Sequence, residues 1–159
     1  MSVIDKIKEK FGDAIVDSHS FRGDDTIVVK KESLKEICTF LRDDKACVFD
    51  YLLDVCGADY LPREPRFEVV YHMHSISKKH RMRVKTQVAD GEKVDSVTSI
   101  WGTADWTERE TYDMYGIEFV GHPNMKRIYM DDDWKGHPLR KDYPERGYKD
   151  EYQPFGEEE

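Results

Sequence analysis

The order of apolar and polar residues over the first 43 positions predicts two helices with two strands between them. Apolar residues recur at helical spacing through residues 4–11 and a glycine follows, which indicates a short opening helix. Residues 14–20 and 25–31 are expected to form strands joined by a Gly-Asp-Asp turn. A second helix is expected over residues 33–43, where a Ser-x-x-Glu capping box opens an apolar helical stripe. The residues of this stripe, which should face the core, are Leu34, Ile37, Cys38 and Leu41.

The middle of the chain follows the two-residue period of β-strands. Residues 47–55 are nearly all apolar, which predicts a strand covered on both faces. After a proline-containing break at residues 61–65, alternation on both sides of a turn at 77–80 predicts an antiparallel hairpin. Its apolar face contains Phe67, Val69, Tyr71, Met73, Met82, Val84, Thr86 and Val88. Its outer row contains Arg81, Arg83, Lys85 and Gln87, which we expect to be solvated, with docking of a partner as the alternative.

Residues 103–116 are expected to form the last helix, with Gly116 as its end and a second capping box over 107–110. One narrow arc of its helical wheel holds Trp106, Arg109, Glu110 and Asp113. Because Arg109 stands four residues before Asp113, these two side chains are expected to pair. Catalytic carboxylates need a cleft and a group that orients the substrate, and the sequence indicates neither. We therefore interpret the arc as an ion-pair network with a structural or docking role.

The order of the predicted elements, α-β-β-α-β-β-β-α, indicates the α+β class, with helices packed on one face of a small mixed or antiparallel sheet. We assign residues 1–117 to this core domain. From residue 118 onward both periodicities fade, while prolines and aromatic residues recur too often for simple disorder. Because Trp, Tyr and Arg anchor many interfaces, residues 118–159 are interpreted as a long extended C-terminal docking arm.

Composition narrows the possible functions. The chain has 159 residues, of which 36% are charged, and its formal net charge of −8 argues against a nucleic-acid partner. No stretch approaches the roughly 18 apolar residues of a membrane span, and the first residues form neither a signal nor a transit pattern. The three cysteines lack a C-x-x-C motif, so we expect buried thiols rather than disulfides or an iron–sulfur cluster.

Histidines and acids raise the question of a metal site, which their spacing supports poorly. His72 and His74 share a strand face, but His80 falls at a turn and no carboxylate or cysteine completes the set. The other candidate set, in the tail, consists of His122, His137 and Asp131–Asp133. A free-standing metal-dependent hydrolase built on this second set remains as an alternative function.

Two blocks in the last third of the chain resemble the signature of the C subunit, the 30 kDa subunit family, of respiratory complex I. Complex I is the proton-pumping NADH-quinone oxidoreductase. The first block consists of Glu108-Arg109-Glu110, Asp113, Met114-Tyr115, His122, Lys126 and Ile128-Tyr129. The second block runs over residues 136–144, Gly-His-Pro-Leu-Arg-Lys-Asp-Tyr-Pro. Residues 1–100 match the family only in the order of their elements.

The resemblance implies a non-catalytic scaffold subunit of the peripheral arm, without a cofactor of its own. It implies docking on the D subunit of complex I, near the B and I subunits, with iron–sulfur clusters, FMN and quinone held by partner subunits. It also implies a peripheral position on the cytoplasmic face of a bacterial or archaeal cell membrane, since no D subunit is fused to the chain. Interface or structural roles are then expected for Trp106, Arg109, Glu110, Asp113, His122, Arg127, His137, Pro138, Arg140, Lys141, Asp142 and Tyr143.

The sequence leaves the electron donor open. Related assemblies accept electrons from ferredoxin or a deazaflavin, and membrane-bound hydrogenases contain a similar subunit, so these remain alternatives to NADH. A soluble adaptor of an unrelated complex is a further, less specific interpretation.

Overall fold

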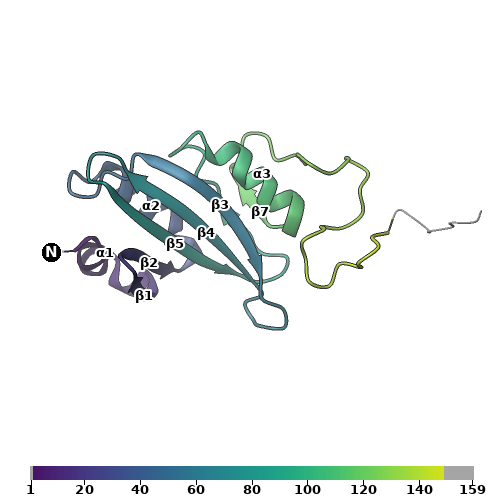
Figure 1. The fold of residues 1–159 in the computed structure, drawn as a ribbon, viewed down its shortest axis with the longest axis horizontal. Coiled ribbons are helices and arrows are strands. Elements are labelled where there is room, and N and C mark those ends of the chain that lie inside the picture. Colours follow the sequence, from purple (N-terminus) through teal and green to yellow (C-terminus); the bar gives the residue numbers. More distant parts are fainter. Residues whose placement is uncertain (1, 149–159) are drawn as a thin grey trace, which may run out of the picture.

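Five strands form one mixed sheet in the computed structural model, which describes residues 2–148 (Figure 1). The strands lie in the order β1-β2-β5-β4-β3. Their bounds are Ile15–Phe21 for β1, Asp24–Val29 for β2, Tyr51–Asp59 for β3, Phe67–Ser75 for β4 and His80–Val88 for β5. β2 and β5 are parallel, and the other neighbours are antiparallel. The expected α+β class is therefore confirmed.

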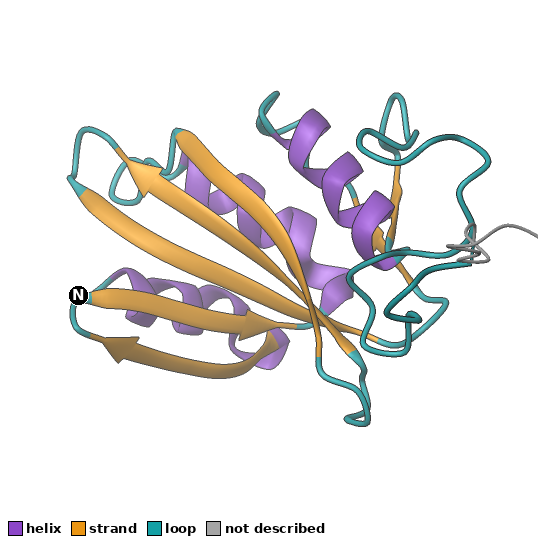
Figure 2. Ribbon diagram, turned by 45° about the vertical axis from the view of Figure 1, so that its right-hand side comes forward, coloured by secondary structure: helices purple, strands orange, loops and turns teal. Residues whose placement is uncertain are grey.

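Two helices, α1 (Val3–Phe11) and α2 (Leu34–Asp43), cover one face of this sheet, as Figure 2 shows. The predicted apolar stripe of α2 is fully buried. The predicted inner face of the β4–β5 hairpin is also buried, with Tyr71 opposite Val84 and Met73 opposite Met82. Hydrophobic burial at these alternating positions fixes the strand register, because a shift by one residue would expose the whole row.

The strand predicted over residues 47–55 is wrong in its bounds and its burial. β3 begins only at Tyr51 and is an edge strand with several exposed side chains. Cys47 and Phe49 are buried, but they enter the core from the turn after α2, where the Cys47 amide donates to the Asp44 carbonyl. The apolar run therefore reflects a buried turn that precedes the strand.

The two predicted capping boxes, at residues 33–36 and 107–110, are both wrong. Ser33 has near-helical backbone angles and makes no side-chain cap, because the 3₁₀ turn Lys31–Ser33 leads directly into α2. The third helix, α3, spans Ala104–Tyr115, so Thr107 lies inside it and donates to the Thr103 carbonyl. A four-residue capping pattern cannot distinguish a helix start from a position one turn later.

Helix α3 packs along β3 at the edge of the sheet. The Thr111 hydroxyl donates to the Val55 carbonyl at 3.0 Å, and the Thr103 hydroxyl donates to the Leu52 carbonyl at 3.2 Å. Gly57 permits this approach, since a Cβ there would lie 2.6 Å from the Tyr115 ring. These contacts cover the free edge of β3 with a helix.

Two short strands were not predicted from the sequence. They are β6 (Lys93–Asp95) and β7 (Glu118–Val120), which pair in parallel and flank α3 in the sequence. Gly116 ends α3 with a φ of +80°, in the left-handed region, as its sequence position suggested. Three residues of the segment assigned to the arm therefore belong to a strand pair.

The segment 121–148 contains neither helix nor strand and runs beside α3 (Figure 1). Residues 149–159 of the predicted arm lie outside the described residues. None of the described helices is long and apolar enough to cross a membrane.

Candidate interface of helix α3 and the C-terminal segment

Asp113 on α3 organises the start of the C-terminal segment. One carboxylate oxygen accepts the backbone amides of Ile128, Tyr129 and Met130 at 2.8–3.0 Å, and the other accepts Arg127 Nη1 at 2.7 Å. Burial alone would raise the pKa of Asp113, but these hydrogen bonds to the charged form outweigh it and lower the pKa. The carboxylate is therefore a fixed negative centre around which the chain turns.

Two arginines of this region bind backbone carbonyls of the segment. Arg127 donates to the carbonyls of Trp134 and Gly136 at 3.1 and 3.0 Å. Arg109 donates to the carbonyls of Lys126 and Arg127 at 3.0 and 2.9 Å. The predicted Arg109–Asp113 pair is wrong, because Arg127 occupies the carboxylate and Arg109 turns toward the carbonyls instead.

His137 packs against the end of α3. Its Nδ1 lies 2.9 Å from the Asp113 carbonyl, and its ring stands against Gly116, where a Cβ would be 2.7 Å away. Burial lowers the pKa of His137. Glycine at position 116 is thus required twice, by its positive φ and by the imidazole pressed against it.

His122 is held at the other end of the helix. Its side chain is fully buried, and the Asn124 amide donates to Nδ1 at 3.0 Å. Nδ1 is therefore an acceptor, and Nε2 carries the proton that faces the Asp105 carbonyl at 3.0 Å and the Asp105 carboxylate at 3.2 Å. His122 and His137 are thus engaged separately, and the described residues contain no group of three or more His, Cys, Asp or Glu suited to a metal ion.

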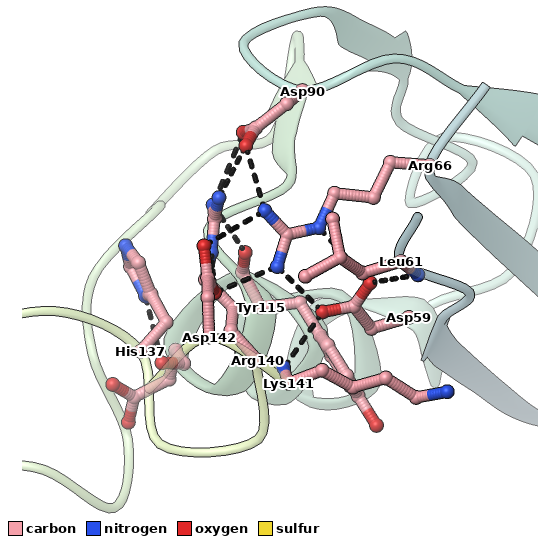
Figure 3. Close-up of polar contacts among 10 residues, drawn as sticks. Asp59, Leu61, Arg66, Asp90, Tyr115, His137, Arg140, Lys141 and Asp142 are labelled. Atoms are coloured by element: carbon pink, nitrogen blue, oxygen red, sulfur yellow. Dashed lines mark hydrogen bonds and ion pairs between the residues drawn. The ribbon is translucent and has the colours of Figure 1, made fainter. Parts of the chain in front are cut away.

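A second cluster joins the end of the described chain to the sheet (Figure 3). Arg66, whose side chain is 5% exposed, donates twice to Asp59, at 2.9 and 2.7 Å. It also donates twice to Asp142 of the C-terminal segment, at 3.0 and 2.7 Å. Asp90 bridges Arg66 and Arg140, and it contacts the Arg66 guanidinium at 3.1 Å.

Backbone groups complete this cluster. The amides of Leu61 and Lys141 donate to the Asp59 carboxylate at 3.0 and 2.8 Å. The double hydrogen bond from Arg66 is the main cause that holds the pKa of Asp59 well below its ordinary value. The same guanidinium lowers the pKa of Asp142 to about 2. Both carboxylates are therefore charged at neutral pH, and one guanidinium clamps the C-terminal segment to the sheet.

Glu108 is a residue of α3 that contacts neither cluster, and it is fully buried. It accepts the Ser96 hydroxyl at 2.6 Å and the Val97 amide at 2.7 Å, which ties the helix to the preceding loop. Burial raises the pKa of Glu108 to about 7, against the effect of these two hydrogen bonds. Residue 108 lies one turn after the buried Ala104, so both side chains lie on the inward face of α3.

The remaining predicted site residues have mixed positions. Pro138 and Tyr143 are half-buried, and the Tyr143 hydroxyl donates to the Lys135 carbonyl at 3.3 Å. Trp106 is 61% exposed, with the Arg109 guanidinium 5.3 Å from its ring centre, and Glu110 is exposed. The structure thus divides the predicted set into residues that fix the segment internally and residues that face outward. Exposed large hydrophobic residues of the segment include Tyr129, Leu139 and Tyr148.

Sequence reasoning missed Asp59, Arg66 and Asp90 as members of this site. Asp59 ends β3, Arg66 immediately precedes β4 and Asp90 lies in the loop after β5, and no local pattern brings them together. The only hint was the charged second block, since Arg140 and Asp142 need partners of opposite charge.

The structure is thus that of an α+β protein whose C-terminal segment is held on the charged helix α3 and on the sheet. The family model described as "Respiratory-chain NADH dehydrogenase, 30 Kd subunit" matches residues 27–149. The chain therefore belongs to this family, and the resemblance to the C subunit of complex I is confirmed.

Individual relatives agree with this assignment. The second NADH-quinone oxidoreductase C subunit of Rhizobium etli is 49% identical over 152 residues, which cover 96% of this chain and 81% of the relative. The NADH-quinone oxidoreductase C subunit of Citrifermentans bemidjiense is 51% identical over 143 residues, which cover 89% and 88%.

The fold is also similar to a chain of a solved assembly, the membrane-bound sulfane sulfur reductase, described as an archaeal respiratory membrane complex. The TM-score is 0.77, and the match covers 90% of this chain and 84% of the other. At 23% sequence identity this similarity concerns the fold alone.

Proposed function

We propose that this chain is a non-catalytic scaffold subunit in the peripheral arm of a proton-pumping NADH-quinone oxidoreductase. It docks on the D subunit, near the B and I subunits, on the cytoplasmic face of the cell membrane. Iron–sulfur clusters, FMN and quinone belong to the partner subunits. The observation that carries this proposal is near-50% identity, along most of the chain, to proteins named as the C subunit of that enzyme.

The internal geometry supports a scaffold role. The charged residues of the two family blocks are largely occupied within the chain: Asp113 and Arg127 pair, Arg109 binds carbonyls and Asp142 binds Arg66. Side chains used in this way fix the path of the C-terminal segment. Exposed aromatic and apolar residues then remain along α3 and the segment, and such residues anchor protein interfaces.

The mechanical task that follows is to present a preformed surface. Ordering a loose arm of many residues during docking would oppose binding, because each immobilised residue loses conformational entropy. Clamping residues 126–143 on the body beforehand removes much of that loss. A rigid subunit of this kind can hold a partner in one orientation, so that the spacing between redox centres stays constant.

Replacement of Arg109 by glutamate tests this role. A carboxylate cannot donate to the carbonyls of Lys126 and Arg127, and it would repel them, so the segment should detach from α3. In a strain that lacks the chain, we expect wild type to restore NADH-dependent quinone reduction in membranes. Arg109→Glu should restore about tenfold less activity.

The matched control is Arg22→Glu, the same charge change at an exposed turn between β1 and β2. It should restore activity to the wild-type level. Equal activity and equal assembly for both variants would contradict the role assigned to Arg109.

A further inference from the structure

A small cleft lies between β3 and α3, beside the clamped segment. Its volume is about 170 Å³. Cys56 of β3 and Met114, Tyr115 and Leu139 form much of its wall. Sites for cofactors and drug-sized ligands usually have volumes of about 300–1,000 Å³, so this cleft is too small for them. It has room for one long side chain.

The cleft carries two carboxylates and no basic residue among the described residues that line it. Asp54 comes from β3 and Glu110 from the outer face of α3. Glu110 has no hydrogen bond or ion pair with any described residue, and the contact of Asp54 is a 3.6 Å hydrogen bond from the Cys56 thiol. His72 stands opposite Asp54 in the ladder, but burial lowers the pKa of His72 and favours its neutral form.

Both acids line the cleft that also contains the Cys56 thiol, and Asp54 accepts a hydrogen bond from this thiol. Burial first, and then the charges of Asp54 and Glu110, raise the pKa of Cys56 to about 11. Two carboxylates and a half-buried thiol therefore share one small cleft. Asp59 and Asp113, the acids that bind the C-terminal segment, each have an arginine and backbone amides as partners. Among the described residues, neither Asp54 nor Glu110 has an arginine or backbone amides as partners.

We propose that a lysine or arginine side chain of a partner subunit occupies this cleft. Its aliphatic stem would lie against Met114, Tyr115 and Leu139, and its cationic head would lie between Asp54 and Glu110. Long basic side chains bury their stems on apolar surface in this way while the charge finds a carboxylate. The inference rests on the proposed function, because it names the chemistry by which the scaffold recognises its partner.

Cys56 supplies a reporter for occupation of the cleft. The other two cysteines, Cys38 and Cys47, are buried, so they serve as internal references for intact folding. We would label the isolated chain and the purified assembly with N-ethylmaleimide and measure the modification of Cys56 by peptide mass spectrometry. We expect at least about tenfold slower labelling of Cys56 in the assembly, because a side chain seated in the cleft blocks access to the thiol, and this outweighs the larger thiolate fraction that its positive charge would cause.

The outcomes separate the two proposals. An assembly in which Cys56 reacts as fast as in the isolated chain overturns the cleft proposal and leaves the scaffold function intact. Failure to recover any assembly overturns the scaffold function and the cleft proposal with it.

Charge reversal gives a second readout. Glu110→Lys places a positive charge where the partner's cation should lie, so the yield of assembly should fall about tenfold. Glu9→Lys, the same change on an exposed position of α1, is the matched control and should assemble normally. Because Glu110 is exposed, the variant should keep the thermal midpoint of wild type. Equal assembly of the two variants would overturn the proposal.

Discussion

Replacing Arg66 with methionine is expected to lower the free energy of unfolding by about 3–5 kcal/mol. The change removes five hydrogen bonds and leaves Asp59, whose side chain is 2% exposed, without its cation. Most of the loss comes from this stranded charge, since Asp142 is about half exposed and can be solvated. Urea unfolding followed by circular dichroism measures the difference.

A thermodynamic cycle makes the prediction specific. In Arg66→Met with Asp59→Asn, the amide oxygen can still accept the Leu61 and Lys141 amides, and no buried charge remains. The double variant should therefore be more stable than Arg66→Met alone. Arg81→Met, at an exposed position of β5, should change stability by less than about 0.5 kcal/mol. An Arg66→Met variant with wild-type stability would exclude a stabilising role for the ion pairs of Arg66 with Asp59 and Asp142.

The stability that the ion pairs of Arg66 contribute should also depend on pH, and the lowered pKa values give the sign of this dependence. The pKa values of Asp59 and Asp142 are lowered by Arg66, so their contribution to stability is complete above the ordinary value of 3.8. This contribution to stability is lost as the pH falls from 3.8 toward about 2. Over this range the unfolded chain binds protons more readily than the native state does.

The second large effect is expected from Glu108→Gln, and it has the opposite pH dependence. The pKa of Glu108 is raised from its ordinary value of 4.5 to about 7, so the native state keeps a proton that the unfolded chain releases. The contribution of Glu108 to stability is complete below pH 4.5 and is lost as the pH rises toward 7. The difference corresponds to about 3 kcal/mol, at about 1.4 kcal/mol per pKa unit.

Glutamine at position 108 can still accept the Val97 amide and can donate to the Ser96 hydroxyl, but it never ionises. We therefore expect Glu108→Gln to be more stable than wild type at about pH 8 by up to about 3 kcal/mol and nearly equal to it at about pH 4.5. If stability changed with pH in the same way for both proteins over this range, a raised pKa of Glu108 in the native state would be excluded. Glu9→Gln, at an exposed position, should follow wild type throughout.

The strands and helices that could be predicted are those whose burial follows a simple period. The alternation in β4 and β5 and the stripe of α2 determined both the type and the orientation of these elements. Residues 47–49 did not follow this logic, because an apolar side chain in a turn can reach the core as well as one in a strand. The short β6–β7 pair could not be predicted, since three residues carry no detectable period.

The charged site was predictable in its members on α3 and the tail but not in its pairings. Arg109 and Asp113 have helical spacing for a pair, yet the tail supplies Arg127 and competes successfully for the carboxylate. Asp59 and Arg66 come from the sheet, and only the folded chain places them beside Asp142. The burial of Glu108 was not predicted, because residues 107–110 were interpreted as a capping box, whereas residue 108 lies one turn inside α3.

The proposed scaffold function is tested most directly by the partners that the chain brings with it. We would tag the chain in its source organism, solubilise the membranes gently, identify the co-purifying proteins and assay quinone reduction in the same fraction. We predict recovery of a protein of the D subunit type and of iron–sulfur subunits, together with NADH-dependent quinone reduction. Recovery of a single soluble chain without partners or activity would contradict the proposed function.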